Sequence, residues 1–186
     1  MIRISDHAKP QPGFTLLELL VVMTLISLQA TVVISAVGNV RERAQNNATN
    51  QLIEQYAFAL FENKLLRNEP YPYAPSDTYY CIGDYPDDRC GFDNSAIEST
   101  EFNEYLESSL QIPVSEFPQI TPVEYVGQTF EGPIYRCRPS GAAGGCDDFY
   151  LYYFLLGENQ TCAGGFAGVT TGGHTYCAYG ANNPAI

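Results

Sequence analysis

One acidic residue lies inside a long apolar run near the start of this chain. The run extends from Gly13 to Val37, and Glu18 is its only formal charge. A carboxylate inside a membrane helix is costly, so it favours a charged or hydrogen-bonding partner. A buried polar pair of this kind can fix the register between packed helices. The simpler alternative is that Glu18 lies near the membrane surface and reaches water.

Six cysteines form the second set of reactive side chains, and all of them lie beyond residue 80: Cys81, Cys90, Cys137, Cys146, Cys162 and Cys177. The gaps within successive pairs are short, so three local bridges are the simplest of the fifteen possible connectivities. None of these gaps has the CxxC spacing of a zinc or thioredoxin site. Free thiols are the alternative, but confinement to one half of the chain favours disulfides and an oxidising compartment.

Acidic side chains crowd a loop of the distal half, and two more precede a later apolar run: Asp84, Asp87, Asp88 and Asp93, then Asp147 and Asp148. Carboxylates on irregular loops can bind calcium. The spacing does not match an EF-hand, so a solvated acidic loop is the main interpretation and calcium the alternative. No other cofactor is expected.

Side chains suited to catalysis are scarce. The chain has two histidines, and near His174 no nucleophile or acidic residue stands at a sequence spacing typical of a catalytic site. The glycine-rich segment Gly141–Gly145 lacks the Lys-Ser/Thr of a phosphate-binding loop. We therefore expect no enzymatic activity.

The net charge of the chain is -12, and beyond Arg67 its only basic residues are Arg89, Arg136 and Arg138. The distal half is therefore strongly acidic. An acidic surface repels the phosphate backbone, so bulk electrostatics argue against nucleic acid as a partner.

The apolar run must be a helix if it is to hold Glu18 in lipid. Residues 14–37 contain neither Gly nor Pro, and as a helix they would extend about 36 Å, enough for a hydrocarbon core of about 30 Å. Residues 1–13 are polar and read as a short leader. An ordinary secretory signal is cleaved after its apolar core, at a site made of small residues. No such cleavage site lies in a helix-breaking segment directly after this run.

Residues 38–69 continue the helix with an amphipathic pattern. Apolar residues recur at helical spacing: Val40, Ala44, Ala48, Leu52, Tyr56 and Leu60, with Ile53, Ala57, Phe61 and Leu65 beside them. The pattern predicts one helix from about Phe14 to about Asn68, with a weak point at Gly38-Asn39. Its outer half needs a partner for this stripe, and the rest of the chain is the obvious one.

Residues 70–186 are predicted to form a globular head. Pro70, Pro72 and Pro75 end the long helix. A short helix is expected over Glu98–Gln111, and extended segments are expected over Tyr79–Ile82, Val123–Val126, Phe130–Arg138, Phe149–Leu156 and Thr175–Tyr179. This order predicts an α+β fold, in which a long N-terminal helix packs on a small antiparallel sheet stapled by disulfides.

All but one of the 14 tyrosines of the chain cluster in this head. We interpret them mainly as core and sheet surface. The alternative is an adhesive aromatic face for glycans or other cell-surface partners.

The segment Gly13-Phe14-Thr15-Leu16-Leu17-Glu18-Leu19-Leu20-Val21-Val22 closely resembles the prepilin signature of type IV pilins and type II secretion pseudopilins. That signature has Gly before the cleaved bond, Phe after it and Glu at the fifth place of the new chain. The resemblance covers about the first third of the chain. The head resembles pilin heads in layout alone.

The resemblance implies that a prepilin peptidase cuts between Gly13 and Phe14 and methylates the new amino group of Phe14. The mature subunit would lie in the inner membrane, in contact with lipid and with its head outside. An inner-membrane assembly platform would then add it to other pilin subunits, with Glu18 paired to an amino group. The positive charges on the two sides of the apolar run barely favour one orientation of the helix in the membrane over the other. The cysteines favour the orientation with the head outside, because disulfides need an oxidising compartment.

The resemblance leaves the kind of filament open. The chain could be a major or minor subunit of an extracellular type IV pilus. It could instead be a periplasmic pseudopilin of a secretion or DNA-uptake system, or an adhesive minor pilin at a filament tip.

Overall fold

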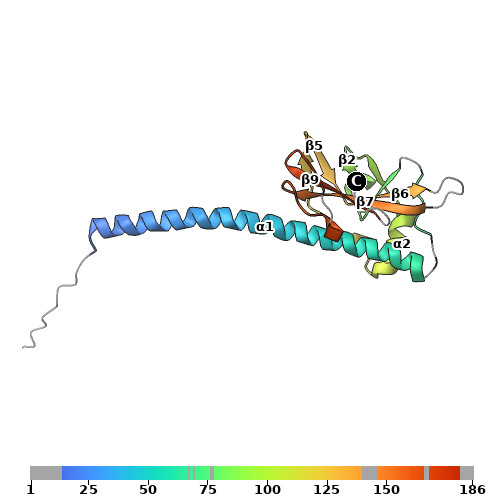
Figure 1. Ribbon diagram of the computed structural model, residues 1–186, viewed down its shortest axis with the longest axis horizontal. Coiled ribbons are helices and arrows are strands. Elements are labelled where there is room, and N and C mark those ends of the chain that lie inside the picture. Colours follow the sequence, from blue (N-terminus) through green and yellow to red (C-terminus); the bar gives the residue numbers. More distant parts are fainter. Residues whose placement is uncertain are drawn as a thin grey trace, which may run out of the picture. The chain divides into compact units, whose positions relative to one another are not determined.

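The computed structural model describes residues 14–66, 68, 70–75, 78–139, 146–165 and 168–180 (Figure 1). The predicted leader, including Gly13, lies outside the described residues, as does the glycine-rich segment 141–145. The chain divides into two compact units, residues 1–41 and 42–186. The division falls inside the long helix, so the second half of that helix belongs to the head unit.

Helix α1 is the longest element and runs from Leu16 to Leu66, a length of 51 residues. The predicted single helix is therefore confirmed except at its two ends. The backbone stays helical through Gly38 and Asn39, where the sequence indicates a weak point. The prolines from Pro70 onward cannot continue a helix, because each lacks an amide donor and clashes with the preceding turn.

The first contacts of α1 with the head differ from the predicted stripe. Ala44 and Ala48 are exposed, whereas Asn46 is buried and Asn50 is half-buried. Further along, the buried positions agree with the prediction and include Ile53, Ala57 and Leu60. The apolar pattern does not predict the first contacts between α1 and the head, because these contacts are polar. The Asn46 and Asn50 side chains form hydrogen bonds with groups of one strand of the sheet and of the segment that follows this strand.

The remaining elements are one further helix and a sheet. Helix α2 spans Thr100–Leu110. The strands are β1 (Tyr79–Cys81), β2 (Arg89–Phe92), β3 (Ala96–Glu98), β4 (Val123–Tyr125), β5 (Gln128–Glu131), β6 (Ile134–Pro139), β7 (Cys146–Leu156), β8 (Val169–Thr171) and β9 (His174–Gly180). They form a 9-stranded sheet in the order β4-β5-β2-β3-β1-β6-β7-β9-β8. Figure 1 shows the sheet along the second half of α1, with α2 beside the last turns of that helix.

Helix α2 confirms the predicted short helix. Ser99 caps it, since its side chain accepts a hydrogen bond from the Phe102 amide. Phe102 and Leu106 are buried, and Tyr105 and Leu110 pack partly against the core. The structure thus places the predicted apolar face of this helix toward the core.

Two details of the sheet differ from the prediction. The predicted run Phe130–Arg138 is two strands, β5 and β6, separated by Gly132 and Pro133. Proline cannot donate to a strand ladder, so it interrupts the run. The sheet is also not wholly antiparallel, because β1 pairs with β3 in parallel while every other pair of named strands is antiparallel.

Strand β7 forms the centre of the core, with side chains buried on both faces. Phe149 and Tyr153 point to α1: the Phe149 ring lies 5.5 Å from that of Phe61, and the Tyr153 hydroxyl donates to Asn50 at 3.1 Å. On the opposite face, the Phe154 ring lies 4.9 Å from that of Phe130. Strands β2, β4 and β5 thus pack against one face of β7, and α1 packs against the other.

The three disulfides join Cys81 to Cys90, Cys137 to Cys146, and Cys162 to Cys177. These are the local bridges that the short gaps predict. They close chain segments with sequence separations of 9, 9 and 15 residues. On a chain-entropy basis, a loop of the longest size contributes about 3 kcal/mol by restricting the unfolded chain.

Tyrosines supply much of the head's core. Tyr56, Tyr135 and Tyr153 are fully buried, and Tyr71 and Tyr85 are buried as well. Three of these hydroxyls donate to backbone carbonyls: that of Tyr56 to Pro118 O, that of Tyr85 to Gly132 O, and that of Tyr135 to Pro72 O. The main interpretation of the tyrosine cluster is therefore confirmed for these residues.

Candidate functional site

The first turn of α1 brings together Thr15 and Glu18, two of the residues in the signature segment. The Thr15 amide and the Thr15 hydroxyl each donate to Glu18 Oε2 at 2.9 Å, and the Glu18 amide donates to Thr15 Oγ1 at 3.2 Å. This reciprocal arrangement is a capping box, which satisfies amide donors that have no partner in the first turn of a helix. The helix dipole also favours a negative charge at this end.

The Glu18 carboxylate is bonded through one oxygen. Both hydrogen bonds reach Oε2, and Oε1 makes none to any described residue. Phe14 lies directly before this turn and is 83 % exposed. In the uncleaved chain Phe14 carries an amide rather than an ammonium, so the predicted pairing of Glu18 with an amino group needs the cut after Gly13. Gly13 itself lies outside the described residues.

Large apolar side chains cover the helix beyond this turn and are exposed. Within residues 14–30 they include Leu16 at 86 %, Leu17 at 73 % and Leu28 at 65 %. The hydroxyls in this stretch bond to the helix itself: Thr24 donates to Val21 O, and Ser27 donates to Met23 O, both at 2.8 Å. An exposed apolar surface of this extent indicates a partner surface or lipid.

Among the residues that the structure describes, no helix combines the length and the apolar composition needed to cross a membrane.

The predicted acidic loop is more ordered than its composition suggests. It contains β2 and a short 3-10 turn, Pro86–Asp88, in which Asp87 has a φ of 63°. Asp148, placed by the sequence in a second acidic pair, is buried in β7 and accepts a hydrogen bond from the Phe149 amide at 2.8 Å. Within the described ranges, no three His, Cys, Asp or Glu side chains lie close enough to hold a metal ion. Calcium binding stays a prediction.

His174, the histidine considered for catalysis, begins strand β9 and lies opposite Leu156 of β7. The six cysteines are all used in disulfides. The candidate site of this chain is therefore the start of α1 rather than a cluster of reactive groups in the head.

Sequence reasoning missed the asparagines that join helices to the head. Asn46 Nδ2 donates to Leu156 O, and Asn46 Oδ1 accepts from the Leu156 amide, both at 2.8 Å. Asn103 of α2 exchanges a similar pair of bonds with Gly83. The available signal is positional: Asn46 lies two helical turns, and Asn50 one helical turn, before the buried Ile53.

Comparison with known proteins places the signature in a family. Residues 8–37 match the family described as the prokaryotic N-terminal methylation motif. No curated protein matches the chain, and no solved structure does. The matched residues include Thr15, Glu18 and the exposed apolar surface that follows them. Residues 8–37 therefore carry the N-terminal methylation motif, the signature of type IV pilins and pseudopilins.

Proposed function

We propose that this chain is the precursor of a structural subunit of a type IV pilus-like filament. A prepilin peptidase cuts the bond between Gly13 and Phe14, and the new amino group of Phe14 is methylated. Residues 14–37 hold the mature subunit in the inner membrane with its head outside. An assembly platform then transfers the subunit into a filament, where α1 packs against the helices of other subunits.

The observation that carries this proposal is the place of the methylation motif in the structure. The motif spans the start of a 51-residue helix whose first turns expose Leu16, Leu17 and Leu20. The second half of the same helix is part of the head's core through Ile53 and Leu60. One half of α1 thus serves the fold, and the other offers an apolar surface to lipid and then to neighbouring subunits.

Glu18 has a specific task in this scheme. Cleavage after Gly13 creates a cation at Phe14, one helical turn from the carboxylate. Within a subunit the pair neutralises the charge in lipid, and between subunits it fixes how far one helix is displaced along its neighbour. A charge-assisted hydrogen bond contributes about 1.5–3 kcal/mol, enough to favour one register among similar apolar packings.

The head supports a structural role outside the cytoplasm. Its three disulfides form in an oxidising compartment and staple β1 to β2, β6 to β7, and the chain after β7 to β9. We propose that the head has no catalytic task and forms the outer surface of the filament. A pseudopilin of a secretion or DNA-uptake system shares the same α1 chemistry and would stay in the periplasm.

The test replaces Glu18 by Ala in cells that assemble the filament. We expect the Glu18→Ala subunit to be cleaved and found in the membrane fraction but absent from sheared filaments. Glu62→Ala is the matched control, since it removes the same charge from the head half of α1 and should leave assembly unchanged. Normal filaments from Glu18→Ala would contradict the proposal.

The same fractionation separates the alternatives. A main structural subunit is abundant along sheared filaments, and its loss removes them. A binding subunit at the tip is scarce, and its deletion leaves filament length unchanged. A pseudopilin is recovered from the periplasmic side of the envelope and not from material sheared off the cell surface.

A further inference from the structure

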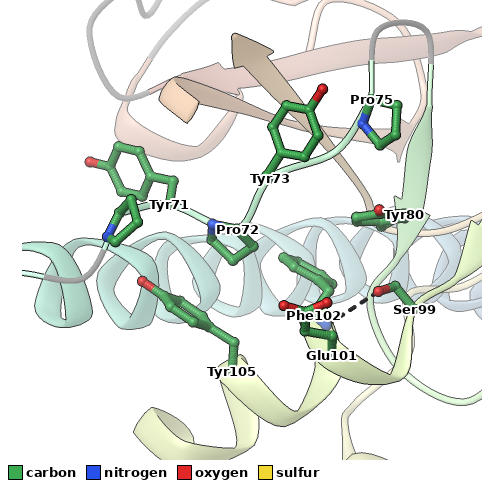
Figure 2. A pocket seen from close by; sticks show the side chains of 10 residues that line it. Tyr71, Pro72, Tyr73, Pro75, Tyr80, Ser99, Glu101, Phe102 and Tyr105 are labelled. Atoms are coloured by element: carbon green, nitrogen blue, oxygen red, sulfur yellow. Dashed lines mark hydrogen bonds between the residues drawn. The ribbon is translucent and has the colours of Figure 1, made fainter. Parts of the chain in front are cut away.

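A cavity in the head lies between the segment 70–75, strand β1 and the first turns of α2. Its volume is about 530 Å³. Figure 2 shows side chains of the 70–75 segment, among them Tyr73, on one side of the gap and Phe102 and Tyr105 of α2 on the other, with Glu101 on the α2 side. The size is within the range of small-molecule sites. Neither the signature at the start of α1 nor the proposed filament role uses this cavity.

The walls of the cavity are held by the core of the head. The Tyr135 hydroxyl donates to Pro72 O at 2.7 Å, which fixes the middle of the 70–75 segment. The Phe102 ring lies 4.5 Å from that of Tyr135 and 5.8 Å from that of Tyr80. Ser99 caps the helix that carries Phe102 and Tyr105. The aromatic surfaces are therefore largely preformed, which lowers the entropy cost of binding.

Glu101 is the one charged side chain in the described lining, which contains no Lys, Arg or His. In the described part of the chain it has no hydrogen-bonding or ion-pair partner. Its charge reaches the aromatic wall: burial raises the pKa of Tyr80, and the negative charge of Glu101 raises this pKa further. Aromatic faces carry negative electrostatic potential, so the rings and the carboxylate together attract a cation and disfavour an anion.

A tyrosine of this lining already binds an ammonium group. Lys64 Nζ lies 4.0 Å from the centroid of the Tyr71 ring, as in a cation–π contact. Lys64 also donates to Asp147 O at 3.1 Å. The chemistry that we infer for the cavity thus occurs at its edge, within the chain itself.

We propose that this cavity binds the quaternary ammonium group of an organic cation, with Glu101 as counter-ion and Tyr73, Tyr80 and Tyr105 as the aromatic wall. A primary ammonium carries three donors that need acceptors. The described lining offers one carboxylate, tyrosine hydroxyls and the Ser99 hydroxyl, which already accepts from the Phe102 amide. A trimethylated ammonium has no N–H donors and presents methyl groups to the rings. The group could come from a free cation such as choline or from a choline headgroup displayed on a surface.

The first experiment titrates choline chloride into the full chain in a maltoside detergent, which carries no choline group. 3,3-Dimethylbutan-1-ol is the matched probe, because it has the shape of choline without its charge. We expect saturable choline binding and binding at least about threefold weaker for the neutral probe, as a cation–π contact at a partly exposed site implies. Equal binding of the two probes, or no saturable binding of choline, overturns the proposal.

Two variants locate the binding. Glu101 is exposed, so Glu101→Gln, which removes the counter-ion, should weaken choline binding about threefold. Glu104→Gln is its matched control, since Glu104 is exposed on the same helix and does not line the cavity. Tyr73→Leu is a second variant; Tyr73 is 48 % exposed, so the change spares the core and should also weaken binding. Unchanged affinity in both Glu101→Gln and Tyr73→Leu overturns the assignment to this cavity.

A last arm separates the two sources. Phosphocholine coupled to albumin is compared with phosphoethanolamine coupled to albumin. Retention on the first carrier alone, competed by free choline, supports a displayed headgroup. Binding of free choline without retention on either carrier supports a free cation. Equal retention on both carriers, unaffected by Glu101→Gln, contradicts recognition of the methylated group. None of these measurements needs assembled filaments, so they stand apart from the test on Glu18.

Discussion

Thr15 and Glu18 bind each other through three hydrogen bonds at the start of α1, at 2.9, 2.9 and 3.2 Å. The carboxylate that the sequence marks as out of place therefore caps its own helix. The remaining oxygen, Oε1, makes no bond to the described residues and can accept one from an ammonium group. In our account, cleavage after Gly13 supplies that group without breaking the cap.

Thr15→Val should loosen this turn. The change removes the hydroxyl that donates to Glu18 Oε2 and accepts from the Glu18 amide, at a cost of about 1 kcal/mol for a lost cap. Hydrogen exchange of the Glu18 and Leu19 amides should become about fivefold faster. Thr15→Ser keeps the hydroxyl and should exchange like the parent chain. Identical exchange in all three proteins would show that the hydroxyl does not stabilise the turn.

Asn46→Ala should destabilise the head, because both backbone groups of Leu156 lose their partner. Two buried, unsatisfied polar groups cost about 2–4 kcal/mol. Chemical denaturation with the disulfides intact measures this loss. Asn47→Ala is the matched control, since Asn47 is exposed on the next position of the helix. If the two variants unfold at the same denaturant concentration, the polar contact contributes nothing.

Replacing Cys162 and Cys177 together by Ser should lower the unfolding free energy by about 2–4 kcal/mol. The bridge closes the longest of the three segments, 15 residues, and ties the chain after β7 to β9. Non-reducing peptide mapping of the parent chain should find three linkages, Cys81–Cys90, Cys137–Cys146 and Cys162–Cys177. A disulfide-linked peptide that joins cysteines from two different pairs would contradict the fold of the sheet.

Alkaline pH should unfold the head abruptly. Burial raises the pKa values of Tyr56, Tyr85, Tyr135 and Tyr153 well above the ordinary value of 10.0. Above that value the unfolded chain releases these protons while the folded chain keeps them, so stability is full below pH 10 and falls as the pH rises further. Phenolate absorbance should therefore rise in one step together with the loss of circular dichroism. Ionisation of all tyrosines in a still folded chain would contradict their burial.

The elements that the sequence predicts well are those with local causes. The α1 run has no breaker for more than twenty residues, and the apolar spacing of Phe102 and Leu106 defines α2. Strands β2, β3 and β8 were not predicted. Each has three or four residues. Strands β2 and β3 also pair with distant segments, β5 and β1, as Tyr80 of β1 does with Ile97 of β3. Strand β8 is a short hairpin partner of β9, across Gly172 and Gly173.

The same reasoning explains what could be known of the sites. Glu18 is visible in the sequence because an acid in an apolar run is conspicuous on its own. The cavity is not visible, because Tyr73, Tyr80 and Glu101 are brought together by the fold. The first contacts of α1 with the head were misassigned for a related reason: hydrophobic periodicity cannot reveal that Asn46 bonds to a strand more than a hundred residues away.

The central claim is that this chain becomes a filament subunit after cleavage before Phe14, and mass spectrometry of the N-terminal peptide from sheared surface filaments tests it most directly. Our account predicts a peptide that begins with singly methylated Phe14 and contains Glu18. A filament protein that retains residues 1–13, or that begins at another residue, would contradict it.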